Sequence, residues 1–93
     1  MTRNDAIYKL MSNYQTWTLW QLERAVEEET GIHHGGASIS AGMREFRTVK
    51  GRERYNLPPE GEVLITKQYS NKASDYRLDP SIIDYQRRTN SGT

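Results

Sequence analysis

Residues 36–47 carry the pattern that most constrains the fold of this chain. Ile39, Gly42, Met43 and Phe46 recur at the three- and four-residue spacing of one helix face, which indicates a short amphipathic helix packed on a core. The opposite face carries small side chains and arginines. Small residues let a helix backbone approach base edges, serine bonds to bases, and arginine binds guanine or phosphate. This helix therefore fits either a DNA groove or an ordinary protein surface.

A second helix is expected just before it. Thr18 and Gln21 have the spacing of a capping box, which would start the helix at Leu19, and Gly31 supplies a left-handed residue to end it. The connection 31–36 has the length and the glycines of the turn in a helix-turn-helix motif. This part of the chain therefore predicts two consecutive helices joined by a tight turn.

The flanking segments predict the remaining elements of the domain. Residues 2–13 have the pattern of a capped amphipathic helix, and residues 14–18 are rich in β-formers and predict a small strand. Residues 62–69 and 75–78 predict a hairpin around the turn residues 70–74. The chain is therefore expected to be α+β, with the element order of a winged helix-turn-helix domain: three helices, a short strand and a β-hairpin wing.

Two segments extend this core arrangement. Residues 48–61 contain a proline pair and are expected to form an extended link, longer than is usual between the third helix and the wing. Asp79-Pro80 is an N-cap followed by proline, which predicts a short helix over 81–88, and residues 89–93 are expected to be disordered. These expectations divide the chain into a winged-helix domain, 1–79, and a C-terminal helix and tail, 80–93.

Four short motifs carry a resemblance to a known class of protein. They are Asp5-Ala-Ile-Tyr8, Trp17-Thr-Leu-Trp-Gln-Leu22, Ser38 through Arg47, and Tyr76-Arg-Leu78. Together they resemble the small winged helix-turn-helix DNA-binding proteins of bacteriophages and prophages. The resemblance implies a role in transcription, excision or replication, with the third helix in the major groove and the hairpin on an adjacent phosphate strand. Gly42 stands where such proteins often carry a basic residue. The glycine is therefore expected to remove a phosphate contact.

The candidate DNA contacts lie on two expected surfaces. The basic side chains of the link and the wing are expected to reach phosphates without reading sequence. Trp17 and Trp20, which flank the capping box, are expected to pack in the core. The candidates on the third helix are Ala37, Ser38, Ser40, Ala41, Arg44, Arg47 and Thr48, and those of the link and wing are Lys50, Arg52, Arg54, Lys67, Lys72 and Arg77.

Charge and composition keep a second function open. The net charge is only +1, and the run Glu27-Glu28-Glu29 would repel a phosphate backbone. The alternative is a winged-helix interaction module that binds or inhibits a host protein. The chain has no cysteine and no recognisable catalytic motif, so we expect no enzyme activity, cofactor or metal. His33-His34, in a glycine-rich segment, is interpreted as a polar turn rather than a metal site.

The expected partners are double-stranded DNA or a host protein, and a second copy of the chain. A terminal helix of about eight residues is marginal alone, so it must pack on its own domain or pair with another copy. We expect a weak homodimer through Ile82, Ile83 and Tyr85, because twofold DNA sites require twofold proteins. The sequence contains no signal-like or membrane-spanning apolar run, which favours a cytoplasmic location. For a phage protein this would be the cytoplasm of the host cell.

Overall fold

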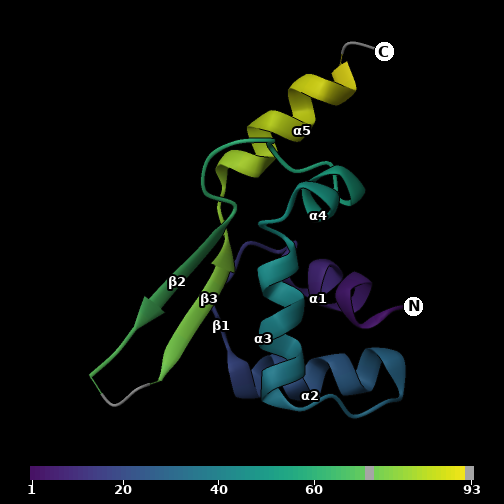
Figure 1. The fold of residues 1–93 in the computed structure, drawn as a ribbon, viewed down its shortest axis with the longest axis vertical. Helices are drawn as coiled ribbons and strands as arrows, with labels where there is room; N and C mark the ends of the chain where they lie inside the picture. Colours follow the sequence, from purple (N-terminus) through teal and green to yellow (C-terminus); the bar gives the residue numbers. More distant parts are fainter. Residues whose placement is uncertain (71–72, 92–93) are drawn as a thin grey trace.

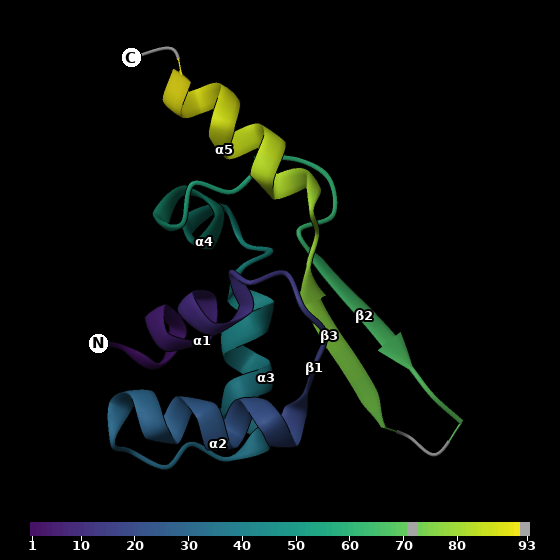
Figure 2. The same ribbon diagram turned by 180° about the vertical axis from the view of Figure 1, so that it is seen from behind.

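The computed structural model describes residues 1–70 and 73–91 of the chain. Figure 1 shows α1, α2 and α3 gathered on one side of a small sheet, with α4 and α5 at the end of the molecule farthest from α2. A β-hairpin projects away from the helices, and Figure 2 shows this arrangement from behind. In chain order the elements are α1 (Arg3–Met11), β1 (Trp17–Thr18), α2 (Leu19–Thr30), α3 (Gly36–Glu45), α4 (Val49–Arg54), β2 (Leu64–Gln68), β3 (Ser74–Leu78) and α5 (Ser81–Ser91).

The first two helices begin and end where their terminal residues dictate. The side chain of Thr2 accepts a hydrogen bond from the backbone of Asp5 at the start of α1. At the start of α2, Thr18 and Gln21 form a complete capping box, and Gly31 ends the helix with a φ of 73°. These predicted caps are confirmed. They could be predicted because each depends on residues within one helical turn.

The strands form an antiparallel sheet in the order β1-β3-β2. Leu64 pairs with Leu78 and Thr66 pairs with Tyr76, so these side chains share one face of the sheet. Leu64 and Leu78 are buried and Tyr76 packs against the core, so this is the face that covers the helices. The alternate residues, which include Lys67, point to the opposite, outward face.

This order of elements defines an α+β fold that is consistent with a winged helix-turn-helix domain. Helices α2 and α3 with the turn between them form the helix-turn-helix, and β2 and β3 form the wing. The predicted strands at 14–18 and 62–69 are shorter in the structure. Tyr14 adopts a left-handed φ of 59°, which turns the chain after α1 and confines β1 to Trp17–Thr18.

The core lies where α1, α2 and α3 meet the inner face of the sheet. An aromatic cluster extends it toward α4: the rings of Tyr8 and Tyr55 are stacked with centroids 4.7 Å apart, and Phe46 meets both edge-on. Tyr55 directly follows α4, so this cluster fixes α4 to the helical layer. The largest fully buried side chains are those of Phe46, Ile7, Met11, Leu22, Ile39, Met43, Leu78, Ile82, Val26 and Val63.

Residues 48–61 are not the extended link that the sequence predicts. Thr48 caps α4 by accepting a hydrogen bond from the backbone of Gly51, and Gly51 lies directly against the backbone carbonyl of Glu45. Helix α4 therefore packs on the end of α3, and only the residues after it connect to β2. The pattern missed α4 because six residues containing a glycine are too few for a helical repeat.

The C-terminal helix is longer than expected. Helix α5 continues through Thr89 to Ser91, so the prediction of disorder from residue 89 is wrong for these positions, and residues 92–93 lie outside the described part of the chain. Within residues 1–70 and 73–91, no helix has both the length and the apolar character that crossing a bilayer requires.

Helix α5 packs on its own domain. Ile82, which the sequence analysis assigns to a homodimer contact, is fully buried in the core that α1, α2 and α3 also form. The side-chain amide of Gln86 donates to the Tyr8 hydroxyl at 2.8 Å and to the backbone carbonyl of Tyr55 at 3.1 Å. A helix of this length is marginal alone, so these contacts account for its formation without a second copy.

A charged network joins the first helix to the fourth. Asp5 accepts hydrogen bonds from the Tyr55 hydroxyl at 2.7 Å and from the Arg54 guanidinium at 3.0 Å. The hydrogen bond from Tyr55, followed by that from Arg54, lowers the pKa of Asp5 from 3.8 to about 2. Burial, followed by the hydrogen bond to Asp5, raises the pKa of Tyr55.

This network is expected to make the folded protein sensitive to acid. Because the pKa of Asp5 is lower in the folded than in the unfolded chain, its contribution is complete above about pH 4 and is lost as the pH falls toward about 2. Thermal unfolding near neutral pH and at about pH 3 measures the loss. Asp5→Asn, which keeps an acceptor oxygen without the charge, should show a smaller difference between the two conditions. An undiminished difference would assign the acid sensitivity to other carboxylates.

Candidate nucleic-acid interface

One face of α3 is left uncovered by the described elements. Ala37 and Arg44 are exposed, and Ser40 and Ala41 are half-buried beside them. These four positions recur at three- and four-residue intervals, so they form a single stripe along the helix. The stripe is turned away from the buried face that holds Ile39, and Figure 1 shows α3 in front of the other helices with the hairpin at its side.

Ser38 belongs to a second set of α3 contacts, directed at α1. The Arg3 guanidinium donates to the Ser38 hydroxyl at 2.9 Å and lies 3.7 Å from the Glu45 carboxylate. The amide of Asn4 also donates to Glu45. Ser38, which the sequence placed among the candidate DNA contacts, is therefore half-buried and holds α3 against α1.

Gly42 faces α1 rather than the uncovered stripe, so the expectation that it removes a phosphate contact is wrong. A Cβ at this position would lie 2.5 Å from Oδ1 of Asn4 and 2.8 Å from Cδ1 of Ile7. The glycine therefore permits the close approach of α1 and α3. A basic side chain here would have to displace α1 before it could reach any ligand.

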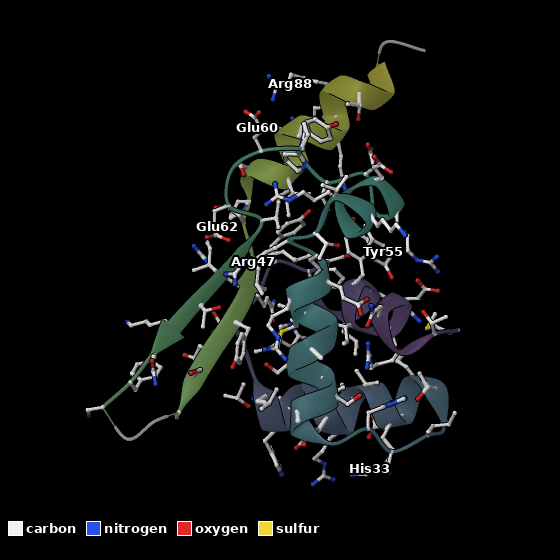
Figure 3. The ribbon with its side chains drawn as sticks, viewed as in Figure 1. His33, Arg47, Tyr55, Glu60, Glu62 and Arg88 are labelled. Atoms are coloured by element: carbon white, nitrogen blue, oxygen red, sulfur yellow. The ribbon has the colours of Figure 1, made fainter. Side chains whose placement is uncertain are left out.

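Arg47 follows α3 and connects it to the wing. Its guanidinium donates to the backbone carbonyl of Leu64 at 2.8 Å and to the Glu62 carboxylate at 3.3 Å, and Figure 3 shows Arg47 and Glu62 close together at the base of the hairpin. Thr48, which the sequence assigned to the same helix, instead caps α4 and donates to the carbonyl of Glu45. Both candidates therefore hold the elements of the fold in place.

Two further arginines of the predicted basic segment have partners inside the protein. Arg52 donates to three backbone carbonyls, those of Arg47 at 3.1 Å, Pro58 at 2.9 Å and Gly61 at 3.0 Å. Arg54 is paired with Asp5 and lies 5.6 Å from the ring of the adjacent tyrosine. The local excess of positive charge is therefore used largely to fold residues 47–61 around α4.

The remaining basic candidates are accessible. Arg44 and Lys50 are exposed, and their side chains form no ion pair or hydrogen bond with the described residues. Lys67 and Arg77 are exposed on the outward face of the wing, and the Lys67 ammonium lies 5.2 Å from the ring centroid of a neighbouring tyrosine. Lys72, a further candidate in the wing, lies outside the described residues.

Trp20 does not pack in the core, contrary to the sequence-based prediction. Its side chain is 62% exposed, and the Arg24 guanidinium lies 5.0 Å from its ring centroid. Trp17 does pack against the core, as expected. The helical spacing of α2 contained a usable signal, because Trp20 is 100° away from Leu19 around the helix and shares a side with Arg24.

The acidic and histidine residues after α2 form surface contacts. Glu27 lies 3.5 Å from His33, and Glu29 forms an ion pair with Lys9 at 2.9 Å. Figure 3 places His33 at the turn after α2. Among residues 1–70 and 73–91, no group of three histidine, cysteine, aspartate or glutamate side chains is arranged to hold a metal ion.

Comparisons with protein-family models, with curated proteins and with solved structures find nothing that matches this chain. The assignment of the interface therefore depends on the geometry of its own residues.

Proposed function

We propose that this protein binds duplex DNA through α3 and the wing. The observation that supports the proposal best is the uncovered stripe of α3, which combines small side chains with one accessible arginine, Arg44. A helix with this surface can approach base edges closely and place a guanidinium on guanine or on phosphate. The proposal includes no catalytic step and no cofactor.

Within this proposal the basic residues have separate tasks. Arg44 contacts the DNA from α3, and Lys50, Lys67 and Arg77 are available for phosphates. The arginines at positions 47, 52 and 54 bind groups within the protein and so hold the wing, the segment after α4, and α1 in place. Taken with the resemblance in the sequence, this favours a phage or prophage regulator of transcription, excision or replication that acts in the host cytoplasm.

Arg44→Ala and Arg47→Ala are expected to separate binding from stability. Loss of Arg44 should weaken duplex binding by about tenfold and lower the salt slope by about one unit, without a change in thermal unfolding. Loss of Arg47 should lower the unfolding free energy by about 1–2 kcal/mol, because its hydrogen bond to the wing is lost. Electrophoretic shifts at several salt concentrations and thermal unfolding of both variants provide the measurements.

The opposite pattern, with affinity dependent on Arg47 and not on Arg44, would remove the stripe of α3 from the interface. If the folded protein binds no random or phage-derived duplex even at low salt, the proposal as a whole is wrong. The alternative, a module that binds or inhibits a host protein, would then be tested by capture from a bacterial lysate. The near-neutral charge of the chain and the acidic run Glu27-Glu28-Glu29 of α2 are the features that favour this alternative.

A homodimer through α5 stays a prediction with fewer residues to form it. Of the three predicted contact residues, Ile82 is fully buried. A second copy could contact only Ile83, which is 38% exposed, and Tyr85, which is half-buried. Residues two positions apart do not share a helix face. Any interface would therefore use one flank of α5 at a time.

A further inference from the structure

A second surface lies across the start of α2 and the outward face of the sheet. A shallow cavity of about 380 Å³ is formed by α2 and the segment before it, with Trp20 and Arg24 in its wall. A neighbouring cavity of about 300 Å³ lies on the sheet and is lined by Lys67, Tyr69 and Arg77, among others. Thr16 lines both cavities, so they adjoin each other at the residue that precedes β1.

The sheet register explains why the second cavity faces outward. Lys67 pairs with Asp75, and Ile65 pairs with Arg77, on the face opposite the buried Leu64. Tyr69 continues the same alternation one step beyond β2 and donates to the Asp75 carboxylate at 2.7 Å. Helices α1, α2 and α3 lie on the opposite side of the sheet, so they leave this face uncovered (Figure 1).

Exposed aromatic rings and cations lie together on this surface. Trp20 is 62% exposed with Arg24 at 5.0 Å from its ring, and Tyr69 is 42% exposed with Lys67 at 5.2 Å from its ring. Arg77 is a third accessible cation. Exposed rings interleaved with basic side chains are typical of sites that hold single-stranded nucleic acid, because bases stack on the rings while phosphates bind the cations.

We propose that this surface, from Trp20 across Thr16 to Tyr69, binds single-stranded nucleic acid. A duplex does not suit it, since the faces of paired bases are already stacked on their neighbours and are closed to a tryptophan or tyrosine ring. The exposed rings favour nucleic acid over an acidic peptide, because both carry negative charge but only nucleic acid has bases that can stack on Trp20 and Tyr69. Lys67 and Arg77 are shared with the proposed duplex interface, whereas Trp20, Arg24 and Tyr69 belong to this surface alone, and the proposal does not depend on duplex binding.

The cations of the surface are free to bind phosphate. Arg24, Lys67 and Arg77 form no ion pair with a carboxylate among residues 1–70 and 73–91. The two carboxylates that line the cavities, Glu28 and Asp75, form no ion pair with these cations among the described residues, and Asp75 accepts a hydrogen bond from Tyr69. Binding should therefore weaken with salt, with a slope of about 0.7 for each phosphate contacted.

The test is binding of a thymidine oligonucleotide of about 12 nucleotides. Binding is measured by the quenching of tryptophan fluorescence and by the fluorescence anisotropy of the labelled strand. Trp20→Ala and Tyr69→Ala are each expected to weaken binding by about tenfold, since stacking of one base is worth about 1–3 kcal/mol. Tyr69→Phe, which keeps the ring and removes the hydroxyl, should bind as the unaltered protein does. Val49→Ala, at an exposed apolar residue of α4 away from this surface, should also have no effect.

The same experiment separates this proposal from duplex binding. Arg44→Ala should leave the affinity for the oligonucleotide unchanged, whatever it does to duplex binding. Because Trp20 and Tyr69 are exposed, their variants should unfold at the same temperature as the unaltered protein. No binding of the oligonucleotide at low salt would overturn the proposal. Equal losses of affinity in Tyr69→Phe and Tyr69→Ala would also overturn it. So would a Trp20→Ala variant that no longer captures a protein from a lysate but binds the oligonucleotide as the unaltered protein does.

Discussion

Gly51→Ala is expected to destabilise the protein by about 3 kcal/mol, the upper part of the range for overpacked sites. An alanine Cβ at position 51 would enter the van der Waals radius of the Glu45 carbonyl oxygen and lie 2.8 Å from its carbon. Both atoms belong to the backbone at the end of α3, so the clash cannot be relieved by a side-chain rotation. The melting temperature should fall by roughly 10–20 °C in a domain of this size.

The sign of this result is informative. Alanine is a better helix former than glycine by about 1 kcal/mol, so helix propensity alone would make Gly51→Ala stabilising. Gly35→Ser is the matched control, because a Cβ at position 35 meets nothing within 4 Å and serine is a favoured N-cap for α3. We expect this control to unfold at the same or a slightly higher temperature. A higher melting temperature for Gly51→Ala would mean that α4 does not pack on Glu45.

Arg52→Ala is expected to lower the unfolding free energy by about 2–3 kcal/mol, because hydrogen bonds from a charged group are among the stronger ones. The guanidinium joins the end of α3 to the turn before β2 through the carbonyls of Arg47, Pro58 and Gly61. Urea unfolding measures the loss, and limited proteolysis of residues 55–63 should become faster in the variant.

A lysine at position 52 should not restore this stability. Its ammonium is a point charge on a flexible stem, whereas the guanidinium spreads its donors across a planar fork. Lys50→Ala serves as the control, since Lys50 is an exposed side chain of the same helix with no partner among the described residues, and it should change the stability by less than about 0.5 kcal/mol. Equal stability of Arg52→Lys and the unaltered protein would show that charge alone, without the shape of the guanidinium, suffices.

Residues that act on their neighbours in the chain were predictable. The capping box of Thr18 and Gln21, the left-handed Gly31 and the inward-facing Leu78 all follow from spacing, because helix caps and strand alternation need only a few consecutive residues. The apolar stripe of α3 was predictable for the same reason, and its uncovered opposite face follows from it.

Contacts between distant segments were not predictable. The sequence shows five basic residues between positions 44 and 54 but not their partners. Arg47, Arg52 and Arg54 are engaged by groups on the wing, the link and α1, and Arg44 alone of the four arginines projects from α3 without a partner among the described residues. Charge composition therefore overstated how much of this segment is available to a ligand.

The sequence by itself determined α1, α2, α3, most of α5, the hairpin and the face of α3 that is turned outward, because local hydrogen bonds and the periodicity of apolar residues decide these features. Only the tertiary structure decided that residues 49–54 become a helix and that Ile82 is buried while Ile83 remains on the surface. Each of these depends on the space left by segments far apart in the chain. Close packing of these segments stabilises the folded state, and no local sequence pattern specifies which distant residues will meet.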